Sequence, residues 1–158
     1  MTMGIVLVAP LASAGPSLWL YPQEAGPREG AHVVLPGTPF ILVIENRGKD
    51  SETNTAHGVE LVIAVENPEG IDTLELAFEG GEAMVLDPIG WEVGVPPLPC
   101  TGKPMSRHGV YPAAFSTIAL ESLSGIDDLV GGQSVEIEVT VEGDESLRVH
   151  FDAMATAW

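Results

Sequence analysis

Basic residues are scarce in this chain of 158 residues. Six Lys plus Arg stand against 23 Asp plus Glu, which gives a formal net charge of −17 at pH 7. Such a surface repels the phosphates of nucleic acids and of anionic lipids, so we expect no nucleic-acid partner. Cations suit this charge, and so does a high-salt medium that screens the repulsion; both explanations of the acidity stay open.

Cysteine is nearly absent, because Cys100 is the only one in the sequence. A single thiol excludes an intramolecular disulfide and a four-cysteine zinc site. We expect this side chain to pack as a small hydrophobic group.

Catalytic signatures are also missing. The sequence contains no G-x-S-x-G, no H-E-x-x-H, no phosphate loop and no dinucleotide-binding fingerprint. Its patterned carboxylates fall on the wet sides of predicted strands, where nothing indicates the opposed environments that a general acid and base require. We therefore predict a protein that is not an enzyme and has no catalytic residues.

No apolar run is long enough to span a bilayer. The run Gly4–Leu11, followed by Ala12-Ser13-Ala14, has the pattern of a signal-peptide core and its cleavage site, without the basic residues that normally precede it. We predict a truncated signal peptide at 1–14 and a single domain at 15–158. The protein is then exported, extracellular or at the cell surface, with no membrane insertion of the mature chain. The alternative for this run is a buried first β-strand.

Glycine, proline and short apolar runs dominate what is present. The 18 Gly and 13 Pro suit a turn-rich β protein, and 45% hydrophobic residues suffice for a sizeable core. About nine strands are expected, with one helical turn in 121–130. We predict an all-β fold, a two-sheet antiparallel β-sandwich of immunoglobulin-like or cohesin-like type. The strands are expected at 17–21, 31–35, 40–44, 59–66, 74–78, 83–86, 91–94, 114–120 and in 134–153.

The clearest pattern is the segment Ser134–Ala153, where apolar residues occupy every second position on both sides of a Gly-Asp-Glu turn. This alternation predicts a β-hairpin with one dry and one wet, acidic face. We expect Arg148, His150 and Asp152 to lie on the wet face, opposite Glu136 and Glu138 of the partner strand, where cross-strand charge pairing explains them. The alternative is a metal ligand pair or a proton relay.

Two neighbouring segments carry a family resemblance. The strand ending at Asn46-Arg47-Gly48 and the alternating strand ending at Pro68-Glu69-Gly70 resemble the first hairpin of secreted immunoglobulin-like modules. The similarity is to CARDB-like domains of bacterial and archaeal surface proteins, with a fold-level likeness to cohesin-like sandwiches. The resemblance implies an extracellular scaffold or binding domain without catalysis.

A polar loop offers a candidate cation site. Asp50, Glu52 and Asn54 place oxygen ligands at alternate positions, and hard cations such as Ca²⁺ prefer oxygen. The loop is not an EF-hand, because Thr55 and Leu61 occupy the glycine and bidentate-glutamate positions. The alternative is a solvated polar loop.

A second candidate metal site contains Cys100 and His108, with Met105 between them. A blue-copper centre combines Cys, His and an axial Met on a β-sandwich. The order is unlike that of copper-binding loops, in which Met follows His. The alternative is a packed cysteine and a histidine that bonds a backbone carbonyl.

We therefore expect a non-catalytic module for adhesion, surface-layer assembly or protein docking, whose partner is a protein or a cell-surface component. The alternative is a β-sandwich that binds metal, of the copper type, or carbohydrate. Aromatic side chains for a sugar platform are Trp19, Tyr21, Trp91, Tyr111 and Trp158.

Overall fold

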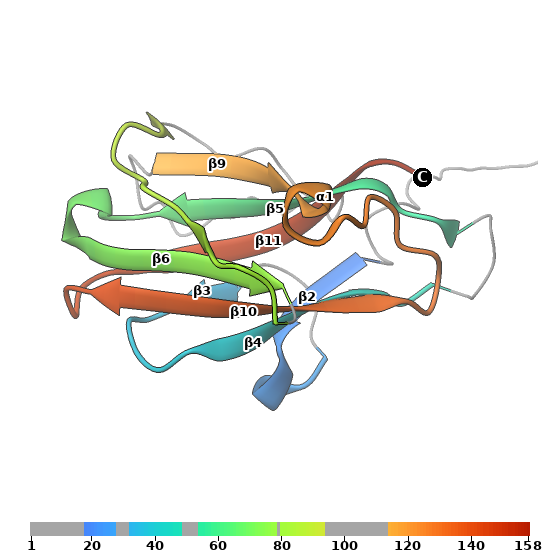
Figure 1. Ribbon diagram of the computed structural model, residues 1–158, viewed down its shortest axis with the longest axis horizontal. Coiled ribbons are helices and arrows are strands. Elements are labelled where there is room, and N and C mark those ends of the chain that lie inside the picture. Colours follow the sequence, from blue (N-terminus) through green and yellow to red (C-terminus); the bar gives the residue numbers. More distant parts are fainter. Residues whose placement is uncertain (1–17, 28–31, 49–53, 79, 94–113) are drawn as a thin grey trace, which may run out of the picture.

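The computed structural model describes residues 18–27, 32–48, 54–78, 80–93 and 114–158. Within these ranges the chain forms two antiparallel five-stranded sheets, which confirms the predicted β-sandwich (Figure 1). Sheet 1 runs in the order β2 (Leu18–Pro22), β4 (Phe40–Asn46), β10 (Ser134–Gly143), β6 (Ile71–Phe78) and β7 (Met84–Val85). Sheet 2 runs in the order β3 (His32–Val34), β11 (Val149–Ala157), β5 (His57–Val65), β9 (Ala114–Ala119) and β8 (Glu92–Val93).

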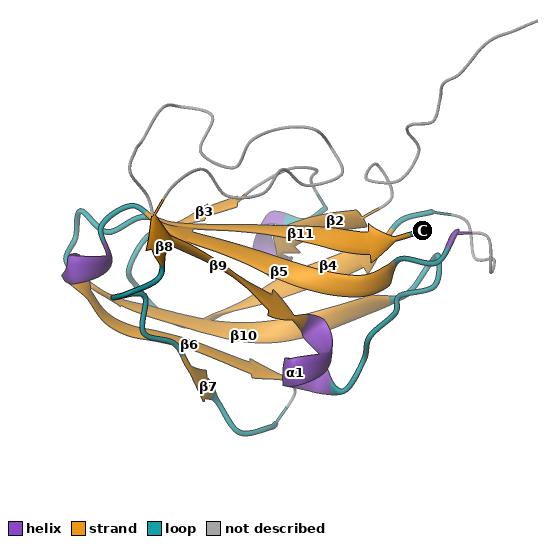
Figure 2. Ribbon diagram, turned by 90° about the horizontal axis from the view of Figure 1, so that it is seen from above, coloured by secondary structure: helices purple, strands orange, loops and turns teal. Residues whose placement is uncertain are grey.

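The core lies between the two sheets and follows from the alternation within each strand. β10 buries every second residue from Val135 to Val141, and the residues between them are polar. From the opposite layer, β5 and β11 contribute Leu61 and Phe151. Figure 2 shows the two sheets as separate layers. Each large side chain that is fully removed from water contributes roughly 2 kcal/mol to stability, so this layer is what holds the two sheets together.

Most connections cross from one sheet to the other. The predicted hairpin at Ser134–Ala153 is wrong, because β10 pairs with β4 and β6, whereas β11 pairs with β3 and β5. Leu147, between the two strands, is fully buried in the core and draws the connection across the sandwich. The predicted pairing of His150 and Asp152 with glutamates of β10 therefore does not occur.

The turn that follows β10 is hydrogen-bonded to the connection between β5 and β6, which also passes from one sheet to the other. The backbone N–H of Asp144 donates to the carbonyl of Gly70 at 2.8 Å. Gly70 ends the single 3₁₀ turn η5 (Pro68–Gly70), which connects β5 to β6. A side chain at Gly143 would overlap the carbonyl oxygen of Gly70. Glycine is needed at this position because the two backbones approach so closely.

The strands that carry the family resemblance also lie apart. β4 belongs to sheet 1 and β5 to sheet 2, so they do not form the expected hairpin. Asn46, at the end of β4, is fully buried. Its side-chain amide donates to the carbonyls of Asn54 and Leu129, at 2.6 and 3.0 Å, and its Oδ1 accepts from the N–H of Gly48. Asn46 therefore joins three backbone segments at this end of the sandwich.

A single helical turn, α1 (Leu120–Ser124), connects β9 to β10 and confirms the one expected in this region (Figure 2). It ends at Gly125, whose φ of 74° few other residues adopt. Leu120 is buried, so the turn closes the core at that end. In the described part of the chain, no helix has the length and apolar character needed to cross a membrane.

Candidate functional site

Most of the residues predicted to bind a metal ion are not among those that the structure describes. Asp50, Glu52, Cys100 and His108 lie outside the described residues. Asn54 is described, and its backbone carbonyl accepts the hydrogen bond from Asn46. Among the described residues, no three His, Cys, Asp or Glu side chains come together to hold a metal ion. The Ca²⁺ and copper sites therefore stay predictions.

His150 and Asp152 do share one face of β11, as the alternation predicts, but that face is not wet. Their side chains are on the outer side of sheet 2, yet His150 is only 7% exposed and Asp152 only 5%. Val62 and Ala64 of β5 are fully buried beside them. The outer face of sheet 2 is therefore closed to solvent around these two groups.

Two different environments result for these groups. His150 Nε2 lies 2.5 Å from Glu66 Oε2, while its Nδ1 is buried with no hydrogen-bond partner among the described residues. Burial raises the pKa of Asp152 to about 6, against the lowering effect of one backbone N–H from Ala153. The folded chain therefore holds the Asp152 proton more tightly than an exposed aspartate would, while Glu66 fixes one ring nitrogen of His150.

The outer face of sheet 1 is exposed along β10 but buried at Tyr21 and Val43, and it carries an organised cluster of large side chains. Trp19 and Tyr21 of β2 lie beside Glu45 and Val43 of β4. Arg47 stacks over the indole of Trp19, with Cζ 4.5 Å from the ring centroid, and pairs with Glu45 at 3.1 Å. This arrangement holds an arginine flat against an aromatic ring at the surface.

Tyr21 completes the cluster from the other side. Its hydroxyl donates to Glu45 Oε1 at 2.6 Å, and the side chain is only 8% exposed. Burial, followed by the hydrogen bond to Glu45, raises the pKa of Tyr21 to about 12. The phenol therefore stays protonated at physiological pH and acts as a fixed donor that orients the carboxylate.

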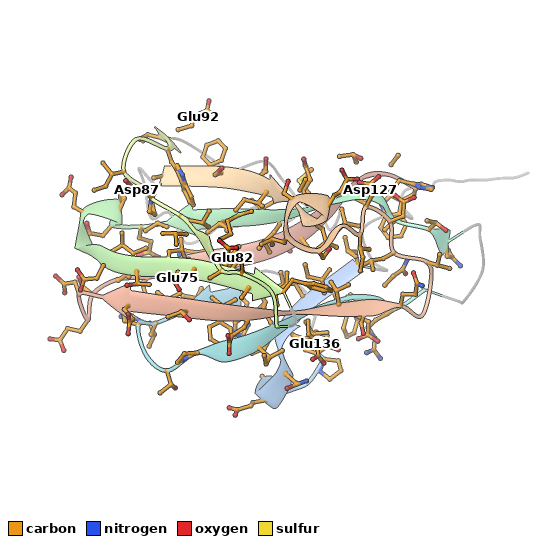
Figure 3. All side chains as sticks on the ribbon, viewed as in Figure 1. Glu75, Glu82, Asp87, Glu92, Asp127 and Glu136 are labelled. Atoms are coloured by element: carbon orange, nitrogen blue, oxygen red, sulfur yellow. The ribbon has the colours of Figure 1, made fainter. Side chains whose placement is uncertain are left out.

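Glutamates extend this surface along β10. Glu136 and Glu138 stand opposite Val43 and Ile41 of β4, and both are exposed. Figure 3 shows Glu136 on β10 and Glu75 on the neighbouring β6. We call the surface formed by these three strands the β2–β4–β10 face; it consists of Trp19, Tyr21, Ile41, Val43, Glu45, Ser134, Glu136 and Glu138.

A groove lies at the end of this face, where β3 of sheet 2 passes η3 (Gln23–Ala25) and the start of β4. Its volume is about 310 Å³. Apolar side chains predominate in its lining, with Pro22, Val33 and Phe40 among them. We call this hollow the edge groove, because it lies between the edge strands β2 and β3.

The sequence alone indicated part of this site. Alternation in 17–21 places Trp19 and Tyr21 on the same side of a strand, but only the pairing of β2 with β4 brings them to Glu45. Of the aromatic residues considered for a sugar platform, Trp19 and Tyr21 share one face of β2, but Tyr21 is buried. Trp91 and Trp158 pack against the core, and Tyr111 lies outside the described residues.

One further ion pair lies on the other sheet. His57 Nδ1 is 3.1 Å from Asp128 Oδ2, and both side chains are well exposed. The hydrogen bonds from His57 and from the N–H of Gly58 hold the pKa of Asp128 below its usual value. Surface pairs of this kind contribute little, so we assign it a local structural role.

Comparisons of the chain with protein-family models, with curated proteins and with solved structures gave no match.

Proposed function

We propose that the chain is an exported, non-catalytic β-sandwich module that docks to another protein through its β2–β4–β10 face. The observation that carries the proposal is the Trp19–Arg47–Glu45–Tyr21 cluster, in which the buried Tyr21 orients Glu45, Glu45 pairs with Arg47, and the exposed Arg47 stacks on Trp19. Adhesion and surface-layer assembly are the settings in which such a module acts, in agreement with the sequence resemblance to surface-protein domains.

The composition of the cluster supports binding to a protein. Trp, Tyr and Arg are the residues that most often dominate the energy of protein interfaces. Here Trp19 and Arg47 are already fixed by contacts within the cluster, so little rotational freedom is lost when a partner covers them. A preorganised surface of this kind favours recognition of a folded partner or an ordered peptide.

The charge of the same face indicates which partners it selects. Glu136 and Glu138 are exposed on the strand next to the cluster. None of the three ion pairs found among the described residues involves either of them. Uncompensated carboxylates attract a basic partner surface and raise its rate of association, an effect that salt weakens.

An affinity capture from the envelope of the source cell tests the proposal. The protein with both Glu136→Lys and Glu138→Lys is compared with the unchanged protein as bait. The matched control carries Glu121→Lys and Glu145→Lys, which make the same change of net charge at exposed positions of α1 and of the β10–β11 connection.

We expect a defined partner to be retained by the unchanged protein and by the control, and to be lost from the double variant of the face. Thermal unfolding of all three proteins verifies that each is folded. If the face variant and the unchanged protein retain the same proteins, or if neither retains any, the docking function is wrong.

A further inference from the structure

The edge groove has walls that are fixed before any ligand arrives. Pro22 ends β2, and Pro39 directly precedes β4; both line the groove. Proline fixes its own φ, so these wall segments have few conformations to lose on binding. Gly37, in the connection between β3 and β4, is tied to the carbonyl of Val141 by a 3.1 Å hydrogen bond. The groove is therefore a built feature of the sandwich edge.

One wall of the groove is an edge strand. β3 pairs with β11 on one side and is the last strand of sheet 2 among the described residues. Part of the backbone of an edge strand points away from its neighbour, which is the arrangement that an added strand uses. Val33, in the middle of β3, is 46% exposed and lines the groove. An extended segment lying there has both a backbone edge and apolar side chains to contact.

The rim of the groove is acidic. Glu24 is itself a lining residue, and Gln23 beside it donates to Glu136 at 2.9 Å. Glu138 stands directly opposite Ile41, which also lines the groove. The ion pairs of the described residues leave all three of these carboxylates without a cationic partner.

From these observations we infer that the edge groove binds an extended basic peptide segment, which adds to β3 with its apolar side chains in the groove and its Lys or Arg residues at the glutamate rim. The inference rests on the proposed docking function and specifies the chemistry of the segment that the partner presents. Charge complementarity selects the basic segment, and the edge strand selects its extended conformation.

Fluorescence polarisation with a labelled Lys-Val-Lys-Val-Lys-Val-Lys peptide tests the inference. We expect this peptide to bind at least about tenfold more tightly than Glu-Val-Glu-Val-Glu-Val-Glu, because opposite charge is favoured and like charge is disfavoured. We also expect N-methylation of alternate backbone amides to weaken its binding at least about fivefold, since an added strand needs its N–H groups. Equal binding of the methylated peptide overturns strand addition at β3.

Two exposed valines on opposite edges of sheet 2 provide a matched pair of variants. Val33 lies on β3 in the groove, and Val93 lies on β8 at the other edge, where it is 63% exposed. Val33→Asp is expected to weaken binding of the basic peptide about tenfold. Val93→Asp introduces the same charge and should leave the affinity within about twofold. Equal affinities for the two variants overturn the location.

The rim is tested in the same way. Glu24→Gln with Glu138→Gln is expected to weaken the basic peptide about fivefold, whereas Glu121→Gln with Glu145→Gln changes it less than about twofold. If both pairs weaken binding equally, the attraction is a property of the net charge and the inferred site is wrong.

These experiments distinguish a failure of the inferred peptide ligand from a failure of the proposed docking function. If the basic peptide does not bind but the envelope partner is lost from the Glu136→Lys/Glu138→Lys bait, docking stands and the inferred ligand is wrong. If the peptide binds in the groove while no envelope protein depends on the β2–β4–β10 face, the proposed docking function is wrong.

Discussion

β10 and β11 have the same sequence pattern and opposite surroundings. Each alternates apolar and polar residues, and in each the apolar set fills the core between the sheets. On β10 the other set, including Glu136 and Glu138, is exposed. On β11 the corresponding set contains His150 and Asp152, and both are buried.

The difference shows what alternation does and does not say. A period of two identifies the residues that share one side of a strand. Whether that side meets water depends on what the rest of the chain places over it. On β11 burial raises the pKa of the Asp152 carboxylate, whereas Glu136 and Glu138 on β10 remain exposed.

The largest expected effect comes from breaking the connection that sends β10 and β11 to opposite sheets. Gly143→Ala places a methyl group against the carbonyl of Gly70. We expect the free energy of unfolding to fall by about 3 kcal/mol, because neither backbone can move without disturbing two turns. Urea unfolding followed by tryptophan fluorescence measures it. Gly37→Ala, with nothing near its added methyl group, is the control and should stay within about 0.5 kcal/mol. Coincident unfolding curves would contradict the close approach.

The next effect separates the buried carboxylate from the exposed ones. Because the pKa of Asp152 in the folded chain, about 6, exceeds its unfolded value of 3.8, the folded protein binds this proton more tightly. The contribution of Asp152 to the free energy of unfolding should therefore rise as the pH falls through 6 and level off below 3.8. Between pH 7 and pH 4, the free energy of unfolding of the unchanged protein should increase by up to about 3 kcal/mol relative to that of Asp152→Asn.

Denaturant unfolding at a series of pH values measures this difference. The control is Glu138→Gln on β10, whose difference from the unchanged protein should stay within about 0.5 kcal/mol across the same range. Parallel pH curves for the unchanged protein and Asp152→Asn would show that Asp152 is not buried as described.

A third comparison sets two hydrogen-bonded pairs against each other. Glu66→Ala removes the partner of the buried His150, and we expect it to lower the free energy of unfolding by about 2 kcal/mol. Gln23→Ala removes the exposed bond to Glu136 and should cost no more than about 0.5 kcal/mol. Thermal unfolding at pH 7 measures both. Equal losses would mean that the two outer faces do not differ in burial.

The smallest effect is expected from charge reversal on the open face. Glu138→Lys relieves repulsion from neighbouring glutamates, so stability should rise by no more than about 0.5 kcal/mol at about 0.1 M salt and be unchanged at about 1 M. Urea unfolding at the two salt concentrations measures the change. A loss of more than about 1 kcal/mol would indicate that this side of β10 is covered.

Much of the fold could be predicted from local pattern. The strands expected at 40–44 and 59–66 are β4 and β5, and the short strand at 31–35 is the edge strand β3. Pairing could not be predicted in the same way, because it depends on contacts far apart in the sequence. The predicted 134–153 hairpin is the clearest case, since the fully buried Leu147 carries the chain into the other sheet.

Less of the candidate site than of the fold could be predicted from the sequence. Alternation places Trp19 and Tyr21 together, but their contact with Glu45 and Arg47 joins segments about 25 residues apart and depends on the β2–β4 register. The edge groove has no sequence motif, because it is formed by the ends of three elements that meet only in the folded chain.

Residue type and spacing are enough to predict the class of fold, the apolar side of each long strand and the acidity of the surface. The pairing of the strands, the exposure of their polar faces and the position of the groove emerge only when distant segments come together, because burial and strand pairing are properties of two or more segments. The alternation on β10 and β11 is the same, yet the polar side of β10 is exposed and that of β11 buries His150 and Asp152.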